Sequence, residues 1–122
     1  MIQRHTLSFK HAFHGIVWAF KTQPNYKIHF LLSVIMLAGS IYFRISYYEF
    51  LLLLLLVVIG LTIETVNTAI EQTTDAIDEK WREDIKFAKD LAAGAMLIFS
   101  AGAFIIACII FIPRIVTLIN FR

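Results

Sequence analysis

The chain alternates between long apolar segments and shorter polar ones, and this pattern predicts four helices. In residues 5–21, Phe9, Phe13 and Phe20 lie on one face, while lysines and histidines occupy the others. Apolar side chains spaced three and four residues apart are typical of an amphipathic helix. Because this segment is too polar to cross a bilayer, we expect a helix that lies in the membrane interface.

Three further segments have apolar interiors long enough to span a membrane, at about residues 24–43, 49–75 and 84–112. Each provides the roughly 20 residues that a helix needs to cross the hydrocarbon core. Pro24 suits the first turn of a helix, and we expect Pro113 to end the last one. The fold class predicted is therefore an all-α membrane protein, with one surface helix and three transmembrane helices.

The composition agrees with that class. Hydrophobic residues make up 59% of the 122 residues, and the mean hydropathy is +0.75. A soluble domain of this size could not bury so much apolar side chain, and the length fits one domain, residues 1–122. The net charge of +2 is too small and too dispersed to suggest nucleic-acid binding. Residues 1–10 contain no apolar stretch of the kind found in a cleavable signal peptide.

Basic residues predict the orientation in the membrane. Eight of the eleven Lys and Arg residues lie before or at the start of the first span, or between the second and third spans. The positive-inside rule then places the N-terminus and the 76–90 loop in the cytoplasm. The turn at 44–49 and the C-terminus face the other side.

A stripe of polar side chains extends from the apolar part of the second span toward its cytoplasmic end. The stripe consists of Glu64, Asn67, Glu71, Asp75 and Asp78, separated by three, four, four and three residues. At roughly 100° per residue, these side chains lie within about 80° of one another on one helix face. Ionised groups at membrane depth are costly, so we expect them to be paired, hydrated or used in function.

The residue types in the stripe suggest phosphoryl transfer to a membrane-embedded alcohol. Glu64 is the deepest acid, and its carboxylate can take a proton from a lipid hydroxyl. Glu71 lies two turns closer to the cytoplasm, roughly 10 Å by helix rise. Oxygen ligands of this kind suit Mg²⁺, which is often bound together with phosphates. Lys89 and Asp90, at the start of the last span, add a cation for phosphate oxygens and a further acid.

Structural roles are alternatives for several of these residues. Asn67 can hydrogen-bond between helices, and Asp75 can simply be solvated beside the loop. His29 is interpreted as a hydrogen-bonded helix residue, and Trp81 with Arg82 as an interfacial anchor. Three helices shelter two intramembrane acids poorly, and small residues at 92–95 and 101–103 allow close helix approach. A homo-oligomer would complete the shelter.

Three motifs resemble the prokaryotic diacylglycerol kinase family, which includes undecaprenol kinases. Residues 64–75 are similar to the family signature E-x-x-N-[ST]-[SA]-[LIV]-E-x-x-x-D. The other two motifs are Ala-Lys-Asp-Leu-Ala-Ala-Gly-Ala at 88–95 and Gln-Pro-Asn-Tyr-Lys-Ile-His at 23–29. With the spacing of the apolar spans, the resemblance covers about residues 5–113.

The resemblance implies a multi-pass lipid kinase of the bacterial plasma membrane, a homotrimer whose active sites are shared between protomers. It implies that ATP with Mg²⁺ phosphorylates a lipid hydroxyl on the cytoplasmic side. The product is undecaprenyl phosphate from undecaprenol, or phosphatidic acid from diacylglycerol. By motif position, Glu64 is the general base and Glu71 a metal ligand. The nucleotide-site residues implied are Asn67, Glu71, Asp75, Lys89 and Asp90, and the residues implied at the lipid or nucleotide entrance are Asn25, Tyr26 and Lys27.

Gln23 departs from the family pattern, which has a metal-binding Glu at this position. An amide oxygen can coordinate Mg²⁺ without contributing charge, so we expect weaker metal binding. An alternative function is therefore a catalytically weak or inactive relative that binds lipid or nucleotide as a membrane oligomer. A small ion or proton carrier would explain Glu64 and Glu71 but not the other two motifs. The forms of 24–29 and 111–114 look more like the undecaprenol-kinase branch, whereas composition does not distinguish the two lipids.

Overall fold

The computed structural model describes residues 2–77 and 82–120, with side chains from residue 7 onward. The described chain is helical, in the order α1 (Ile2–Thr22), α2 (Pro24–Tyr42), α3 (Tyr47–Ile77) and α4 (Glu83–Asn120). The four predicted helices are confirmed, with most ends shifted by one to three residues. Asp78, at the end of the predicted stripe, and Trp81 lie outside the described residues.

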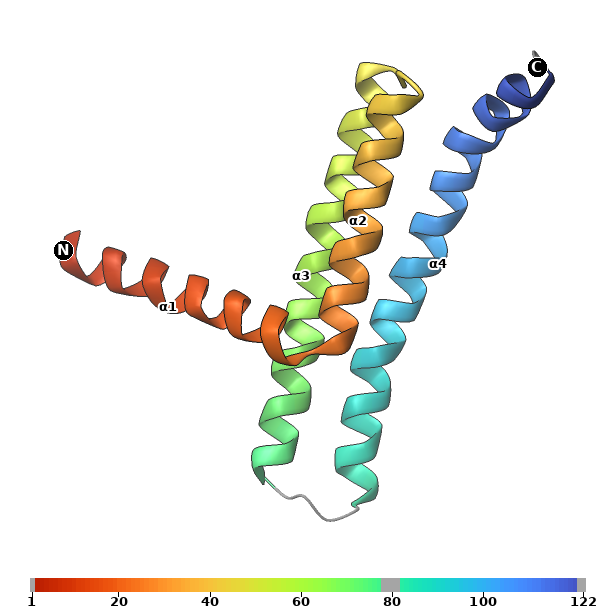
Figure 1. Ribbon diagram of the computed structural model, residues 1–122. Helices are drawn as coiled ribbons and strands as arrows, with labels where there is room; N and C mark the ends of the chain where they lie inside the picture. The colour runs from red at the N-terminus through yellow and green to blue at the C-terminus, as the bar shows by residue number, and fades with distance from the viewer. Residues whose placement is uncertain (1, 78–81, 121–122) are drawn as a thin grey trace.

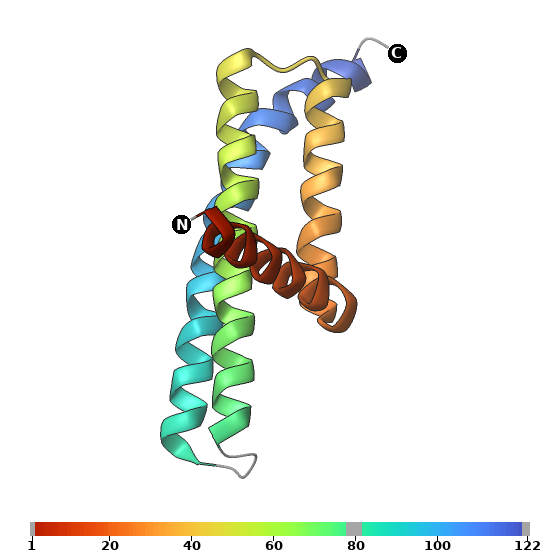
Figure 2. The ribbon, with the colours of Figure 1, turned by 90° about the vertical axis from the view of Figure 1, so that its left-hand side faces the viewer.

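Helix α3 is the centre of the arrangement. It packs against α2 on one side and α4 on the other, and α1 projects away from the start of α2 at a steep angle (Figure 1). The last turns of α3 and the first turns of α4 continue together past the junction between α1 and α2 (Figure 2). The segment that carries the polar stripe therefore lies at and beyond this junction.

Within the described part of the chain, α3 and α4 are long and apolar enough to cross a membrane. Only 17% and 11% of their most apolar windows are buried, whereas the core helices of soluble proteins are mostly buried. Helix α2 is shorter, at 19 residues, and begins with polar residues that lower its hydropathy. A membrane-spanning role for 24–43, an interfacial position for α1 and a homotrimer remain predictions.

An ion pair at the start of α3 joins this helix to α4. Arg44 adopts a positive φ of 48°, and Ser46 then precedes the first turn of α3. The Ser46 backbone N–H donates to Glu49 Oε2 at 2.8 Å, and the Glu49 N–H donates to Ser46 Oγ at 3.4 Å. This reciprocal arrangement is a capping box. Arg114 Nη2 of α4 donates to the same Glu49 oxygen at 2.7 Å, so one carboxylate caps α3 and anchors α4.

The expectation that Pro113 ends the last helix is wrong, because α4 continues through it to Asn120. Proline lacks the N–H that would reach back one turn. Neighbouring polar side chains donate to carbonyls around this point: Arg114 Nη1 to Ile110 O at 2.5 Å, and Thr117 Oγ1 to Pro113 O at 2.8 Å. Such side-chain donors are one reason why proline is tolerated in apolar helices.

Gly60 sets the close contact between α3 and α4. A Cβ at this position would lie 2.6 Å from Cε1 of Phe99, so the ring occupies the space that a side chain would need. Gly102, by comparison, has nothing within 4 Å of an added Cβ.

We therefore expect Gly60→Ala to destabilise the protein by about 1–3 kcal/mol through overpacking against Phe99. Thermal unfolding in detergent micelles measures the effect, and Phe99→Leu in the same background should recover part of the loss. Gly102→Ala is the matched control and should be neutral or slightly stabilising, since alanine favours helix. Equal stability of the two alanine variants would contradict this role for Gly60.

Candidate active site

Glu64 is buried where α2 and α3 meet. Only 2% of the residue is exposed, and its Oε2 lies 3.8 Å from Nε2 of His29 on α2. An acid at this depth was expected to be paired, hydrated or used in function, whereas His29 was expected to be a hydrogen-bonded helix residue and not a neighbour of Glu64. The one sign in the sequence that His29 lies near the site is its position at the end of the 23–29 motif. The two side chains belong to different helices, so only the packing of α2 on α3 brings them together.

Tyr26 fixes the same contact between α2 and α3. It is buried, and its hydroxyl lies 3.3 Å from Oγ1 of Thr65, the residue after Glu64. Its neighbours Asn25 and Lys27 are exposed. The three residues predicted at the entrance thus divide into one that packs beside the buried acid and two that face the surface.

Asn67 and Glu71 form the next level of the stripe. Asn67 Nδ2 donates to Glu71 Oε1 at 3.1 Å, one helical turn along α3. Asn67 is 5% exposed, and its Oδ1 is buried without a hydrogen-bond partner among the described residues. A buried acceptor of this kind is unusual and calls for a ligand, an ion or water.

These oxygens fit a metal that arrives together with phosphates. Mg²⁺ is commonly held by one or two protein oxygens, with water and phosphate completing its shell. The unpaired Oδ1 of Asn67 and the Glu71 carboxylate supply such oxygens. Within the described residues, no group of three or more His, Cys, Asp or Glu side chains forms a metal site built from protein alone.

Gln23, the other predicted metal ligand, lies at the N-cap of α2. Its Nε2 is 3.5 Å from Oγ1 of Thr22, the preceding residue. Among the described residues, Gln23 and Glu71 share no hydrogen bond: the side chain of Gln23 bonds to Thr22, and that of Glu71 to Asn67. Joint binding of a metal by these two residues therefore stays a prediction.

At the exposed end of the stripe, Lys89 of α4 forms an ion pair with Asp75 of α3. The pair joins two motifs that are far apart in the sequence. Asp90, in contrast, lies 3.8 Å from Lys86 Nζ within its own helix. Lys89 therefore contacts an acid of the stripe on α3. Asp90 instead forms its ion pair within α4.

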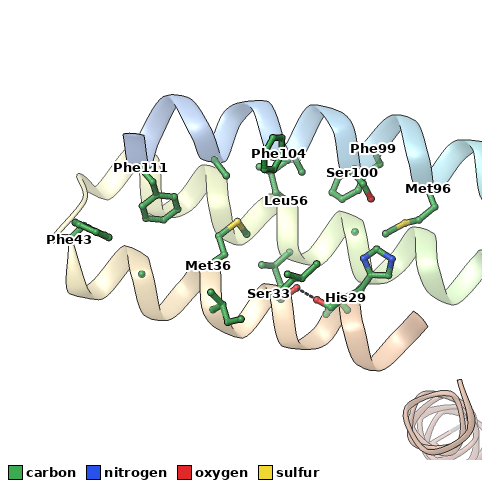
Figure 3. A pocket seen from close by; sticks show the side chains of 18 of the residues that line it. His29, Ser33, Met36, Phe43, Leu56, Met96, Phe99, Ser100, Phe104 and Phe111 are labelled. Carbon is green, nitrogen blue, oxygen red and sulfur yellow. Dashed lines mark hydrogen bonds between the residues drawn. The ribbon is translucent and has the colours of Figure 1, made fainter. Parts of the chain in front are cut away.

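An apolar groove leads away from the buried acid, between α2 and α4, with α3 as its floor (Figure 3). Its volume is about 530 Å³. His29 lies at one end and Phe43 and Phe111 at the other, while Met36, Leu56 and Phe104 lie between them. Sequence periodicity could not reveal this groove, because its walls come from three helices.

Comparisons with known proteins agree on one family. The family model described as prokaryotic diacylglycerol kinase matches residues 10–111. The chain is 34% identical over 114 residues to undecaprenol kinase of Bacillus subtilis, and this match covers 93% of each chain. It is 30% identical over 113 residues to diacylglycerol kinase of a Synechocystis species, and this match covers 92% of this chain and 65% of that protein.

The Asp75–Lys89 pair is expected to add little stability. Its side chains are 50% and 35% exposed, and an exposed ion pair contributes about 0–1 kcal/mol. A double-mutant cycle with Asp75→Asn and Lys89→Gln, measured by thermal unfolding, should give a coupling below about 1 kcal/mol that weakens with salt. The Glu49–Arg114 pair, 29% exposed at each residue, is the comparison and should couple more strongly. The reverse order would contradict this assignment.

Proposed function

The chain belongs to the prokaryotic diacylglycerol kinase family and is a lipid kinase, and we propose that it transfers the γ-phosphoryl group of ATP to the hydroxyl of a membrane lipid alcohol. The acceptor is undecaprenol or diacylglycerol, and the product is undecaprenyl phosphate or phosphatidic acid. The match to undecaprenol kinase over nearly the full length of both chains makes undecaprenol the first acceptor to test. The observation that carries the proposal is the buried Glu64 beside the inner end of an apolar groove.

Glu64 is the proposed general base. A lipid alcohol must lose its hydroxyl proton as its oxygen attacks the γ-phosphorus, and a carboxylate within hydrogen-bond reach can accept that proton. The burial of Glu64 keeps bulk water from competing for this position. The nearest side chain of α2 recorded beside it is His29, whose Nε2 lies 3.8 Å from Glu64 Oε2.

The proposed nucleotide site uses the more exposed half of the stripe. Asn67 Oδ1 and the Glu71 carboxylate would hold Mg²⁺ with the phosphates of ATP, and the ion would neutralise their charge during transfer. Asp75 and Asp90 are the remaining acids proposed for this site. Lys89 is paired with Asp75, and its ammonium group is proposed to turn toward the phosphates when ATP binds. The acceptor oxygen and the γ-phosphate would then meet between Glu64 and Glu71.

The proposed setting is the bacterial plasma membrane, with the N-terminus and the loop between α3 and α4 in the cytoplasm, where ATP is available. Three membrane-spanning helices and a homotrimer complete the proposal. The many exposed apolar side chains of α2, α3 and α4 support both a lipid environment and contacts between protomers.

Glu64→Gln should lower kcat for lipid phosphorylation by about 10²- to 10⁴-fold, because the amide cannot accept the hydroxyl proton. The assay measures transfer from labelled ATP to undecaprenol or dioleoylglycerol in detergent micelles with Mg²⁺. Glu83→Gln, the same change at an exposed residue in the first turn of α4, is the control and should keep wild-type activity. A Glu64→Gln enzyme with wild-type kcat would remove Glu64 from the mechanism.

Gln23→Glu should lower the Mg²⁺ concentration needed for the half-maximal rate by about three- to tenfold, since it adds a charged oxygen ligand. A Mg²⁺ titration at fixed ATP measures this, and Gln72→Glu on an exposed part of α3 controls for the added charge. Equal Mg²⁺ dependence in all three proteins would show that position 23 does not contact the metal.

A wild type that binds nucleotide but phosphorylates neither lipid would instead favour the alternative function, an inactive relative that binds lipid or nucleotide as a membrane oligomer.

A further inference from the structure

We propose that a pocket between the end of α2 and the last turns of α4 binds the phosphate of an anionic phospholipid, in the membrane leaflet opposite to the kinase site. This arginine pocket is lined by Tyr42, Phe43, Arg44, Arg114, Thr117 and Leu118. Its volume is about 610 Å³, which is within the range of sites that hold small ligands. The choice of leaflet rests on the orientation in the proposed function, whereas the binding of the phosphate does not.

The arginine pocket lies at the end of the molecule opposite to the ion pair of Asp75 and Lys89. Figure 1 shows the turn between α2 and α3 at the same end as the last turns of α4. Three of the eleven Lys and Arg residues are expected on this side of the membrane. Two of them, Arg44 and Arg114, line this one pocket, and only the packing of distant segments brings them together.

Arg44 occupies a backbone position that favours glycine. Its φ is 48°, in the left-handed region. The Arg44 N–H donates to Ile41 O at 3.1 Å, and the Ile45 N–H donates to Ser40 O at 3.2 Å. These two bonds form a Schellman motif, whose left-handed residue is usually glycine because a Cβ there strains the backbone. A strained residue that is not glycine points to a use for its side chain.

The two guanidinium groups of the arginine pocket differ in their partners. Arg114 donates to Glu49 Oε2 at 2.7 Å and to Ile110 O at 2.5 Å. Arg44 is exposed, and its side chain makes no hydrogen bond or ion pair with any described residue. Two cations and one carboxylate leave a single positive charge at the pocket. A phosphodiester carries one negative charge and would neutralise it, and a guanidinium can donate two parallel N–H bonds to phosphate oxygens.

The other walls favour a lipid over a soluble phosphate. Phe43 and Leu118 are apolar, and Tyr42 beside them is 69% exposed. Tyr47 and Tyr48, at the start of α3, are exposed as well. Tyrosines are enriched at the level of the lipid head groups. A phosphate in the arginine pocket would therefore lie at head-group level, with apolar surface beside it for the glycerol and acyl carbons.

Thermal unfolding in micelles of detergent and phosphatidylcholine, with increasing phosphatidylglycerol, tests the pocket. The Tm of wild type should rise by about 3–8 °C and then level off, because a ligand that binds only the folded protein stabilises it. Without phosphatidylglycerol, Arg44→Gly should unfold at the wild-type Tm or above it, since glycine relieves the backbone strain. The same variant should lose most of the rise, whereas Arg44→Lys, which keeps the charge, should retain part of it.

Arg82→Gln is the matched control, because it removes one exposed positive charge near the start of α4, at the other end of the molecule. Its Tm should rise with phosphatidylglycerol as that of wild type does. Native mass spectrometry gives a second readout. Wild type and Arg82→Gln should each retain one phosphatidylglycerol per chain more than Arg44→Gly retains.

An unchanged rise in Arg44→Gly, or an equal loss in Arg44→Gly and Arg82→Gln, would overturn the proposal, the second by assigning the effect to general charge attraction. The same rise with inorganic phosphate or glycerol 3-phosphate would assign the pocket to soluble phosphates and also overturn it. A much lower Tm of Arg44→Gly without phosphatidylglycerol would give Arg44 a role in folding and overturn the argument from strain. None of these measurements depends on phosphoryl transfer, so the proposed kinase function stands or falls separately.

Discussion

The cost of a carboxylate at membrane depth is the constraint on which this structure depends. Glu64 lies on a helix whose preceding turns are apolar, so its carboxylate needs a partner on a neighbouring helix. The group recorded nearest to it on α2 is the His29 imidazole, at 3.8 Å, which is longer than a hydrogen bond, and Tyr26 packs beside it with its hydroxyl 3.3 Å from Thr65 Oγ1. Asn67, Glu71 and Asp75 then follow the same helix face outward. The packing of α2 on α3 therefore buries the innermost acid of the stripe.

The fold around this contact has a small core. Its buried apolar residues are few, and most large apolar side chains are exposed. One ion pair joins helices at each end of the bundle. Glu49 joins the α2–α3 turn to α4 through Arg114, and Asp75 joins α3 to Lys89 at the opposite end of α3. Between these two ion pairs, the Phe99 ring of α4 packs against Gly60 of α3, and α2 and α4 form the walls of the groove.

Local features were predictable because they depend on residues close together in the chain. The four helices, their approximate ends and the face shared by Glu64, Asn67 and Glu71 follow from helical periodicity. The prediction that Pro113 ends the helix was wrong because the rule that proline breaks a helix considers only the backbone. It ignores hydrogen-bond donors on neighbouring side chains, here those of Arg114 and Thr117. Asp90 shares a motif with Lys89 but lies beside Lys86, since successive residues on a helix point in different directions.

By itself, the sequence determined the helical class, the apolar character of α3 and α4, the order of acids along α3 and the family motifs. These are properties of composition and of spacing within single segments. Only the tertiary structure decided that His29 meets Glu64, that Lys89 meets Asp75, and that an apolar groove ends beside the buried acid. Each of these depends on the relative rotation and displacement of two or three helices. Those are set by packing between side chains distant in the chain, such as Phe99 against Gly60.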